Sequence, residues 1–362
     1  MATWKKGQIT DDNGVVREAQ FPVIISASRS TDIPAFYVDW FFTRLQKGYS
    51  AWTNPFNGVK SYVSYEDVRF IVFWSKNPRP LLKYLHILDE HNIKCYIQYT
   101  LNDYEREGLE KVPFLEYRIE TFKMLSERLG KDAMIWRFDP LLLTDKISID
   151  DLLGKIQNIG DQLKEYTKKL VFSFADIESY KKVKNNLIHN GIHYREWENG
   201  QMETFAEKLS NMNIERGWNF QLATCGEKID IYKYGIGHNR CIDGDLITRL
   251  AWEDKQLMDF MKVKIEDVPS PDLFARQELP EGAIPLPHNH YFISNHKKDS
   301  GQRHFCECMA SKDIGEYNTC VHLCEYCYAN TSKNTATQNY KCHKINPYAD
   351  TITGKYVTGT GE

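Results

Sequence analysis

Three cysteines lie within eight positions of the stretch CVHLCEYCYAN, residues 320–330. Cys320, Cys324 and Cys327 have the spacing C-x3-C-x2-C. A disulfide joins two sulfurs and a closed zinc site takes four ligands, whereas three thiolates in a compact run leave one iron of a [4Fe-4S] cluster without a cysteine. The spacing therefore predicts such a cluster, with zinc as the alternative metal. Tyr326, just before the last cysteine, is placed to shield the cluster and to contact a bound ligand.

Four further cysteines form a second candidate set. They lie near predicted strand ends or in irregular segments, and they are Cys225, Cys241, Cys306 and Cys308. Four ligands would close a site, either as a fully ligated iron–sulfur cluster or as a structural zinc. Of the two remaining cysteines, Cys95 lies inside an apolar segment and is interpreted as a small buried hydrophobe. Cys342 is interpreted as a surface thiol without a partner.

The elements that must position these residues follow a repeating pattern from residue 21 to about 225, in which short apolar runs alternate with amphipathic helical stretches. The runs are FPVIISAS (21–28), YSAWTNP (49–55), VRFIVFWSKNP (68–78), IKCYIQYT (93–100), AMIWRFDP (133–140), KLVFSFAD (169–176) and NFQLATCGE (219–227). Continuous apolar strands separated by helices indicate parallel strands that are buried on both faces. Seven such units predict an α/β fold, a (β/α) TIM-type barrel that is complete or partial. One of the helices is expected to begin after Ser148 as its N-cap.

Polar residues follow the predicted strands at the end that forms the active-site face of a parallel barrel. Loop starts and helix caps explain any one of them, but charges that converge on one rim need partners or a ligand. We therefore expect a pocket for a polar, zwitterionic ligand. The catalytic candidates are Arg29, Asp32, Lys76, Arg137, Asp139 and Glu227. The candidates for cofactor binding are Asn54, Asn77, Gln98, Thr100 and Tyr326.

The chain is expected to divide into five parts. These are an N-terminal extension (1–20), the barrel (21–250), a proline-rich connection (251–305), an iron–sulfur segment packed at the barrel mouth (306–330) and a polar C-terminal tail (331–362). The connection carries five prolines between residues 269 and 287, which predicts extended backbone rather than helix.

Charge and hydropathy restrict the class of protein. A net charge of −3 gives no general electrostatic affinity for nucleic acid, although Trp52, Trp74 and Trp136 at strand ends leave base stacking open. The N-terminus lacks the apolar segment of a secretory signal, and no apolar run approaches the roughly 20 residues that span a bilayer. We therefore expect a cytoplasmic protein without a membrane partner, in which nine cysteines indicate metal or redox chemistry rather than disulfides.

Several motifs taken together resemble the uncharacterised family DUF1848 over roughly residues 20–330. They are SRSTDIP, FWSKNP, WRFDP, ATCGE and CxC…SKDIGEYNTCxxxCxYCYAN. The C-terminal cysteines of that family are similar to the cluster motif of radical S-adenosyl-L-methionine (SAM) enzymes, and the pattern C-x3-C-x-Tyr-C matches it here. Radical SAM enzymes carry the motif after the first barrel strand, whereas here it follows all the predicted strands. The resemblance therefore implies a permuted arrangement in which the C-terminal segment reaches over the barrel mouth.

The leading hypothesis is a radical-SAM-like iron–sulfur enzyme. One-electron reduction of SAM at the open iron would give a 5′-deoxyadenosyl radical, which abstracts hydrogen from a small polar substrate in the barrel. An electron donor such as a flavodoxin or a ferredoxin would be the partner. The charged rim residues would bind the polar ends of SAM and of the substrate; they are Arg29, Lys76, Arg137, Asp139 and Glu227.

Two other classes of protein remain open. One is an iron–sulfur protein without SAM chemistry, acting in redox reactions or in nucleic-acid processing. The other is a zinc-stabilised barrel hydrolase in which Asp32, Asp139 and Glu227 serve as general acid and base. His322, inside the cysteine motif, is an alternative fourth cluster ligand, but a solvated loop histidine is the more ordinary interpretation.

Overall fold

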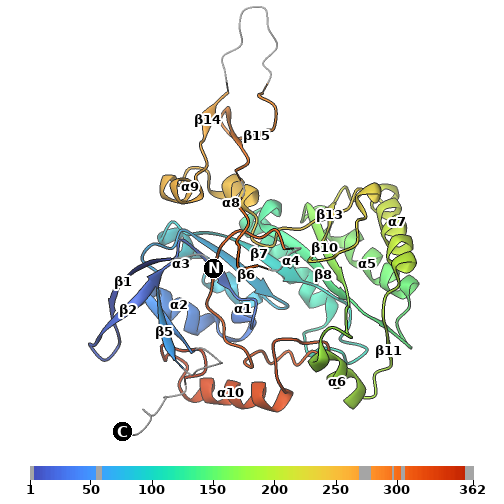
Figure 1. Ribbon diagram of the computed structural model, residues 1–362, viewed down its shortest axis with the longest axis horizontal. Helices are drawn as coiled ribbons and strands as arrows, with labels where there is room; N and C mark the ends of the chain where they lie inside the picture. The colour runs from blue at the N-terminus through green and yellow to red at the C-terminus, as the bar shows by residue number, and fades with distance from the viewer. Residues whose placement is uncertain (1–3, 54–58, 269–278, 296, 303–305, 355–362) are drawn as a thin grey trace, which may run out of the picture.

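A parallel sheet of eight strands lies at the centre of the protein (Figure 1). The computed structural model describes residues 4–53, 59–268, 279–295, 297–302 and 306–354. Every neighbouring pair of strands in this sheet is parallel. In spatial order the strands are β13 (Gly237–His238), β12 (Gln221–Thr224), β10 (Lys169–Phe174), β8 (Met134–Leu141), β7 (Lys94–Thr100), β6 (Phe70–Ser75), β3 (Ile24–Ala27) and β17 (Lys312–Asp313).

Both faces of the sheet are buried, as the apolar runs predict. Successive side chains of a strand point to opposite faces. In β6, Phe70 and Val72 therefore belong to an inner core, while Ile71 and Phe73 belong to a separate outer core. Strands that are apolar on both faces suit a parallel sheet covered on each side. The α/β fold class is confirmed.

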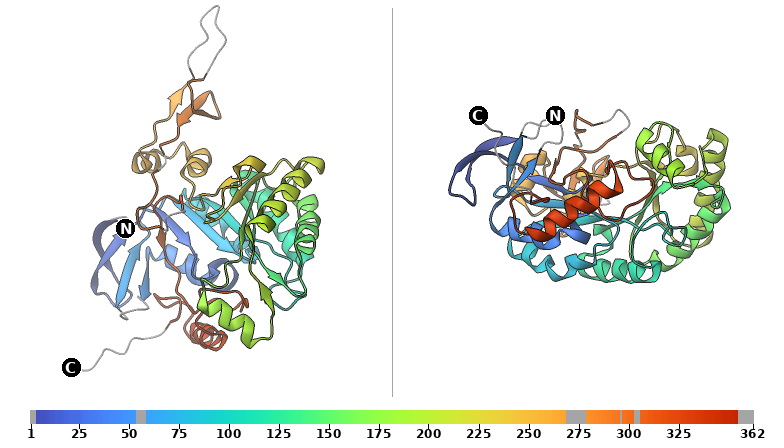
Figure 2. Two further views of the ribbon diagram at one scale, coloured as in Figure 1. Left: turned by 45° about the vertical axis from the view of Figure 1, so that its right-hand side comes forward. Right: turned by 90° about the horizontal axis from the view of Figure 1, so that it is seen from below.

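Helices cover the outer face of the sheet. They are α1 (Ile33–Phe36), α2 (Val38–Gln46), α3 (Leu85–Glu90), α4 (Leu115–Leu129), α5 (Ile149–Leu163), α6 (Lys181–His189) and α7 (Asn199–Glu215), and each contributes to the outer core. Seen from below in Figure 2, the helices follow a curve, and the red C-terminal helix lies inside it. Helix α5 begins after Ser148, which forms a capping box with Asp151, as predicted for its N-cap.

The inner face is covered at the amino ends of the strands by two short helices. These are α8 (Gly244–Ala251) and α9 (Lys255–Met261), which are N-capped by Asp243 and Asp254. Leu246 and Leu257 pack into the inner core. The carboxyl ends of the strands are left for polar residues and for the cysteines.

The sheet is open rather than a closed barrel. Its edge strands are β13 and β17, and no ladder joins them within the described residues. Each is only two residues long and offers too few backbone groups for a continuous ladder. The expectation of a complete barrel is therefore not met.

A second sheet of four strands lies beside the first. Its order is β1 (Lys5–Thr10), β2 (Val16–Phe21), β5 (Lys60–Ser64) and β4 (Tyr49–Thr53). The prediction that the run 49–55 forms the second strand of the barrel is wrong. Its strand β4 belongs to this second sheet and pairs antiparallel with β5. Only residues 54–59 separate these two strands, whereas a parallel pair needs a crossover of about a dozen residues or more. Asn54 lies outside the described residues.

Smaller elements complete the described chain. They are the pair β9 (Leu143–Thr144) and β11 (Tyr194–Arg195), the sheet of β14 (Glu266–Asp267), β16 (His290–Ile293) and β15 (Ala283–Leu286), the 3-10 turns η1 (Arg79–Lys83), η2 (Lys131–Ala133) and η3 (Tyr232–Tyr234), and α10 (Lys333–Ile345). Helix α10 lies in the segment expected to be a polar tail, and Ser332 caps it. None of the helices in the described ranges has the length and apolarity that a membrane crossing requires.

Candidate metal centres

Strand β17 attaches the cysteine motif to the carboxyl end of the sheet. It pairs in parallel with β3, with Lys312 opposite Ile25. The Asp313 carboxylate accepts hydrogen bonds from the backbone N–H of Arg29 (2.8 Å) and from the Ser30 hydroxyl (3.2 Å). The loop that carries the three cysteines therefore leaves its strand at the same end of the sheet as the loops that follow the other strands.

His322 anchors this loop from within. Its Nε2 lies 2.7 Å from the Asp32 carboxylate, and its Nδ1 lies 3.0 Å from the carbonyl oxygen of Lys111. The side chain is 2% exposed. The interpretation of a solvated histidine is therefore wrong. Both ring nitrogens face protein acceptors, so neither is directed at an iron in this arrangement.

Asp32 is the point at which several segments meet. Besides His322, its carboxylate accepts hydrogen bonds from the Ser75 hydroxyl and from the backbone N–H of Lys76, each at 2.7 Å. It also caps α1 by accepting from the N–H of Ala35 at 3.0 Å. Asp32, predicted as a catalytic residue, thus joins β3, β6 and the cysteine loop.

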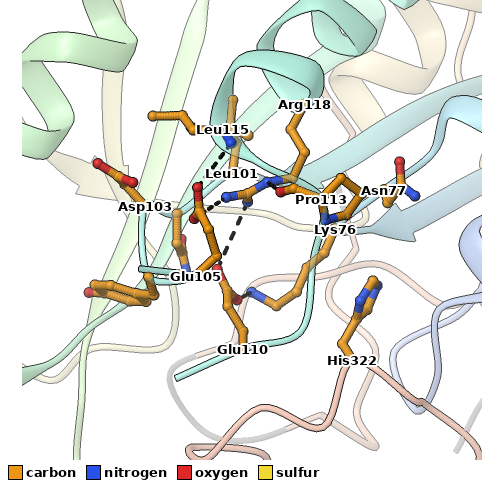
Figure 3. A network of polar contacts seen from close by, with 12 residues as sticks. Lys76, Asn77, Leu101, Asp103, Glu105, Glu110, Pro113, Leu115, Arg118 and His322 are labelled. Carbon is orange, nitrogen blue, oxygen red and sulfur yellow. Dashed lines mark hydrogen bonds and ion pairs between the residues drawn. The ribbon is translucent and has the colours of Figure 1, made fainter. Parts of the chain in front are cut away.

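Tyr326 meets a buried ion pair that the sequence did not indicate. Its hydroxyl donates to the Glu110 carboxylate (2.6 Å) and accepts from Lys76 Nζ (2.9 Å) and from the Asn102 amide (3.2 Å). Lys76 Nζ lies 2.7 Å from the same Glu110 oxygen. Figure 3 shows Lys76 and Glu110 turned toward each other beside His322. These contacts fix the tyrosine that stands between Cys324 and Cys327.

Arg118 supports this pair from α4. Its guanidinium lies 3.9 Å from Glu110 and 2.6 Å from Glu105, and its Nε donates to the carbonyl oxygen of Pro113 at 2.8 Å (Figure 3). Burial disfavours the charge on Glu110, but Lys76 and Arg118 outweigh it and lower its pKa. Burial likewise opposes the charge of Lys76, and Glu110 outweighs it and raises that pKa. The site therefore holds an ionised, buried network.

The three motif cysteines lie on one loop and are close enough for each to affect the charge of another. Burial raises the pKa of Cys320, Cys324 and Cys327. Asp32 and then Cys327 add to the rise for Cys320, and Glu110, Cys327 and Cys320 add to it for Cys324. Backbone N–H groups oppose this rise, from His322 at Cys320 and from Asn330 at Cys327. Amides directed at sulfur are the hydrogen bonds that tune iron–sulfur clusters.

The second set of cysteines is also brought together. The sulfurs of Cys225 and Cys241 are 3.3 Å apart, and Cys308 is near enough to Cys241 and Cys306 for both to raise its pKa. The Cys308 sulfur also accepts from the backbone N–H of Cys241 at 3.2 Å. Four cysteines spread over 84 positions of the sequence thus lie as neighbours in the fold, and we call them the thiol tetrad.

Two buried arginines stand beside the thiol tetrad. Arg137 Nη1 lies 3.2 Å from the Cys241 sulfur and 3.2 Å from the Gln98 side-chain oxygen. Burial opposes the charge of Arg29, but negative charge at Cys308 and Asp313 outweighs it and raises the Arg29 pKa. Hydrogen bonds from Cys225 and Cys308, together with Arg137, lower the pKa of Cys241.

Most of the remaining rim candidates also belong to the side of the sheet near the tetrad. Asp139 pairs with Arg137 and accepts a hydrogen bond from Ser173. Glu227 accepts from the backbone N–H of Phe174 at 2.9 Å, and burial raises its pKa to about 7. The predicted rim therefore has two parts, one at the cysteine motif and one at the tetrad. Lys76, Asp32 and Tyr326 form the first part, and Arg29, Gln98, Arg137, Asp139 and Glu227 form the second.

Other predicted site residues have less defined surroundings. The Asn77 backbone N–H donates to Ser75, while its side-chain oxygen is buried without a hydrogen bond. Thr100 pairs with Arg137 in the ladder of β7 and β8. Trp136 lies in the outer core with its indole N–H bonded to the carbonyl oxygen of Leu101, so it is not placed to stack on a base.

Trp74 lies between the two buried arginines of the inner face. The Arg29 and Arg137 guanidinium carbons are 5.7 Å and 5.3 Å from the centre of its ring. Two pockets, of about 390 and 490 Å³, lie elsewhere, the first beside Lys155 and the second beside Lys169. Neither pocket is lined by a cysteine.

Within the described ranges, no group of three or more Cys, His, Asp or Glu side chains is arranged to hold a single metal ion. For the cysteine motif this is compatible with a cluster, because each thiolate of a [4Fe-4S] centre binds a different iron and the sulfurs need not converge on one point. In the tetrad, the sulfurs of Cys225 and Cys241 contact each other directly. Tetrahedral zinc with bonds of about 2.3 Å separates its sulfurs by about 3.8 Å, so 3.3 Å is slightly too close.

The comparisons with known proteins identify the family. The model of the family described as a domain of unknown function, DUF1848, matches residues 24–329. The chain therefore belongs to this family. No curated protein and no solved structure matches it.

Proposed function

We propose that the protein is a radical-SAM-like iron–sulfur enzyme with a [4Fe-4S] cluster on Cys320, Cys324 and Cys327. The observation that supports this most is the place of β17 at the edge of the sheet, next to β3. Counted across the sheet from that edge, the cysteine loop follows the first strand, although it comes last in the sequence. This position supports the permuted arrangement that the radical SAM resemblance implies.

The residues around the motif suit such a cluster. Cys324 is 8% exposed, and its sulfur lies 4.0 Å from the Glu110 carboxylate that Lys76 neutralises. Backbone amides of the loop are directed at Cys320 and Cys327. Burial, an adjacent cation and N–H groups near sulfur are the means by which a protein holds and tunes a cluster.

The protein's own residues would orient the reactants and exclude water. A [4Fe-4S] cluster held by Cys320, Cys324 and Cys327 would supply the one-electron reduction that cleaves SAM and starts radical chemistry on the substrate. A flavodoxin or ferredoxin would provide the electron. Arg29, whose Nη2 is buried without a hydrogen bond, is a donor for a carboxylate or phosphate group of a small polar substrate. Tyr326, held by Lys76 and Glu110, forms the wall between the cluster and that substrate.

The alternative of a zinc-stabilised hydrolase needs carboxylates that are free to act as general acid and base, and two of its three candidates are engaged by the protein. Asp32 accepts four hydrogen bonds, two of them from backbone N–H groups. Asp139 is paired with Arg137 and bonded to Ser173. A general base needs a lone pair directed at its substrate, and Asp32 and Asp139 direct theirs at the protein. Glu227, the third carboxylate of this alternative, accepts one hydrogen bond from the backbone N–H of Phe174, and burial raises its pKa to about 7, which suits a general acid or base.

The experiment is anaerobic reconstitution with iron and sulfide, followed by metal counting and visible spectroscopy. Replacing Cys320, Cys324 or Cys327 with Ala should abolish the broad visible absorbance of this cluster. Cys342→Ser is the matched control, because Cys342 lies in α10 outside both cysteine sets, and it should keep the absorbance. Retention of the absorbance in all three Ala variants would refute the proposal.

A further inference from the structure

The open edges of the sheet face a gap that the thiol tetrad spans. Cys225 directly follows β12, and Cys241 comes shortly after the edge strand β13. Cys306 and Cys308 come shortly before the opposite edge strand β17. Backbone contacts accompany the thiols, since the N–H of Met309 donates to the carbonyl oxygen of Ile242 at 3.1 Å. The tetrad therefore lies where segments next to the two edge strands meet, although no strand ladder joins those edges within the described residues.

The four side chains present sulfur and nothing else to the centre of this junction. Cys241 and Cys308 are 5% and 3% exposed, and Cys225 and Cys306 are partly buried. Four thiolates form a complete ligand set for a soft tetrahedral ion, with no position left open for a substrate. The 3.3 Å contact between Cys225 and Cys241 must widen by about 0.5 Å to reach the sulfur separation around zinc. The tetrad side chains must also turn toward one point, because no three metal-ligating side chains of the described residues converge as they stand.

Cations and hydrogen-bond donors around the tetrad offset the negative charge that four thiolates would carry. A divalent ion with four thiolates carries a net charge of about −2, which is costly to bury without nearby cations. Arg137 Nη1 lies 3.2 Å from the Cys241 sulfur, and the Asn239 amide also donates to it at 3.2 Å. The N–H groups of Cys241 and Ile242 donate to Cys308 at 3.2 and 3.4 Å. Arg29 adds a second buried cation whose Nη2 has no hydrogen-bond partner.

We propose that the thiol tetrad binds one zinc ion, which joins the β13 and β17 edges and so completes the barrel where the backbone ladder is missing. Metal binding then contributes directly to folding stability, as in other structural zinc sites. The role is separate from the cluster on Cys320, Cys324 and Cys327. It requires no redox step and no SAM.

The test uses the full-length protein and counts zinc per chain. The wild-type protein should hold about one zinc, and Cys306→Ser should lose it, whereas Cys342→Ser should retain it. Cys306→His offers a second ligand type at a partly buried position and should keep zinc, which guards against a variant that merely fails to fold. The triple variant with Ala at positions 320, 324 and 327 should also retain zinc, which makes this result independent of the proposed function.

Hydrogen exchange gives a second readout. Removing zinc with a chelator should speed amide exchange in peptides that contain β13 and β17, while the central strand β7 should be less affected. Loss of several iron atoms, rather than one zinc, in Cys306→Ser would show that a cluster occupies the tetrad and would overturn the zinc assignment. Wild-type protein that is purified without metal and with a Cys225–Cys241 disulfide would overturn the zinc assignment as well.

Discussion

At the residue scale, the site depends on buried charges whose partners come from distant segments. Lys76 is 15% exposed and Glu110 is fully buried, and both meet Tyr326 of the cysteine loop. The sequence indicated Lys76 and Tyr326 by their position at a strand end and in the motif. It did not indicate Glu110, because a glutamate in a polar loop carries no pattern that distinguishes a buried partner from a solvated one.

Replacing Lys76 with Met should destabilise the protein by on the order of 3 kcal/mol, because it leaves the buried Glu110 carboxylate with Arg118 as its remaining cation, 3.9 Å away. The double variant Lys76→Met/Glu110→Gln should be more stable than Lys76→Met, since the uncompensated charge is removed with its partner. Urea unfolding of both variants measures this difference.

Lys94→Met is the matched control, because Lys94 is an exposed lysine of β7, and it should change stability by no more than about 0.5 kcal/mol. A Lys76→Met variant that unfolds at the wild-type urea concentration would show that the pair contributes nothing. A double variant less stable than the single one would show that the loss comes from packing rather than charge.

At the scale of elements, six of the seven predicted runs form strands of the parallel sheet. Each of these runs is apolar without interruption, which indicates a strand buried on both faces. This pattern can be recognised from a short stretch of sequence alone. The edge strands β13 and β17 escaped prediction because two residues are too few for any periodicity. The contact between the cysteine loop and β3 escaped it too, because Asp313 and Arg29 are 284 positions apart.

Gly315 makes the close approach of β17 to β3 possible. A Cβ at this position would lie 1.8 Å from the Ser28 hydroxyl and 2.6 Å from that of Ser30, and both serines are buried. Gly315→Ala should therefore cost about 1–3 kcal/mol and displace the cysteine loop. Thermal unfolding measures the first effect, and visible absorbance after reconstitution measures the second.

Gly154→Ala provides the comparison for this substitution. Gly154 lies on the exposed side of α5, and a Cβ there would meet nothing within 4 Å. The change should stabilise the protein by up to about 1 kcal/mol through helix propensity. If the melting temperature of Gly315→Ala equals or exceeds that of the wild-type protein, the close packing of β17 on β3 does not hold in solution.

At the scale of the whole molecule, the C-terminal segment holds distant parts together. Tyr37 of the first helical region donates to the carbonyl oxygen of Thr319 at 2.6 Å, and Trp40 of α2 donates to that of Ala349 at 2.8 Å. Lys60 of β5 pairs with Asp350 at 2.7 Å. Seen from below in Figure 2, the red helix of this segment lies inside the curve of helices. The cysteine motif is therefore part of one continuous strap that runs from β17 to the second sheet and packs on the outer core through Ile314, Tyr326 and Ile352.

The proposed enzyme requires a cluster with one open iron, and the EPR spectrum of the reduced, anaerobically reconstituted protein tests this most directly. On the proposed function, adding SAM should change the cluster signal, because the SAM amino and carboxylate groups would bind the open iron. Reduction with dithionite should then yield 5′-deoxyadenosine. A spectrum that does not respond to SAM, with no 5′-deoxyadenosine formed, would contradict the radical enzyme and leave the cluster a structural or purely redox role.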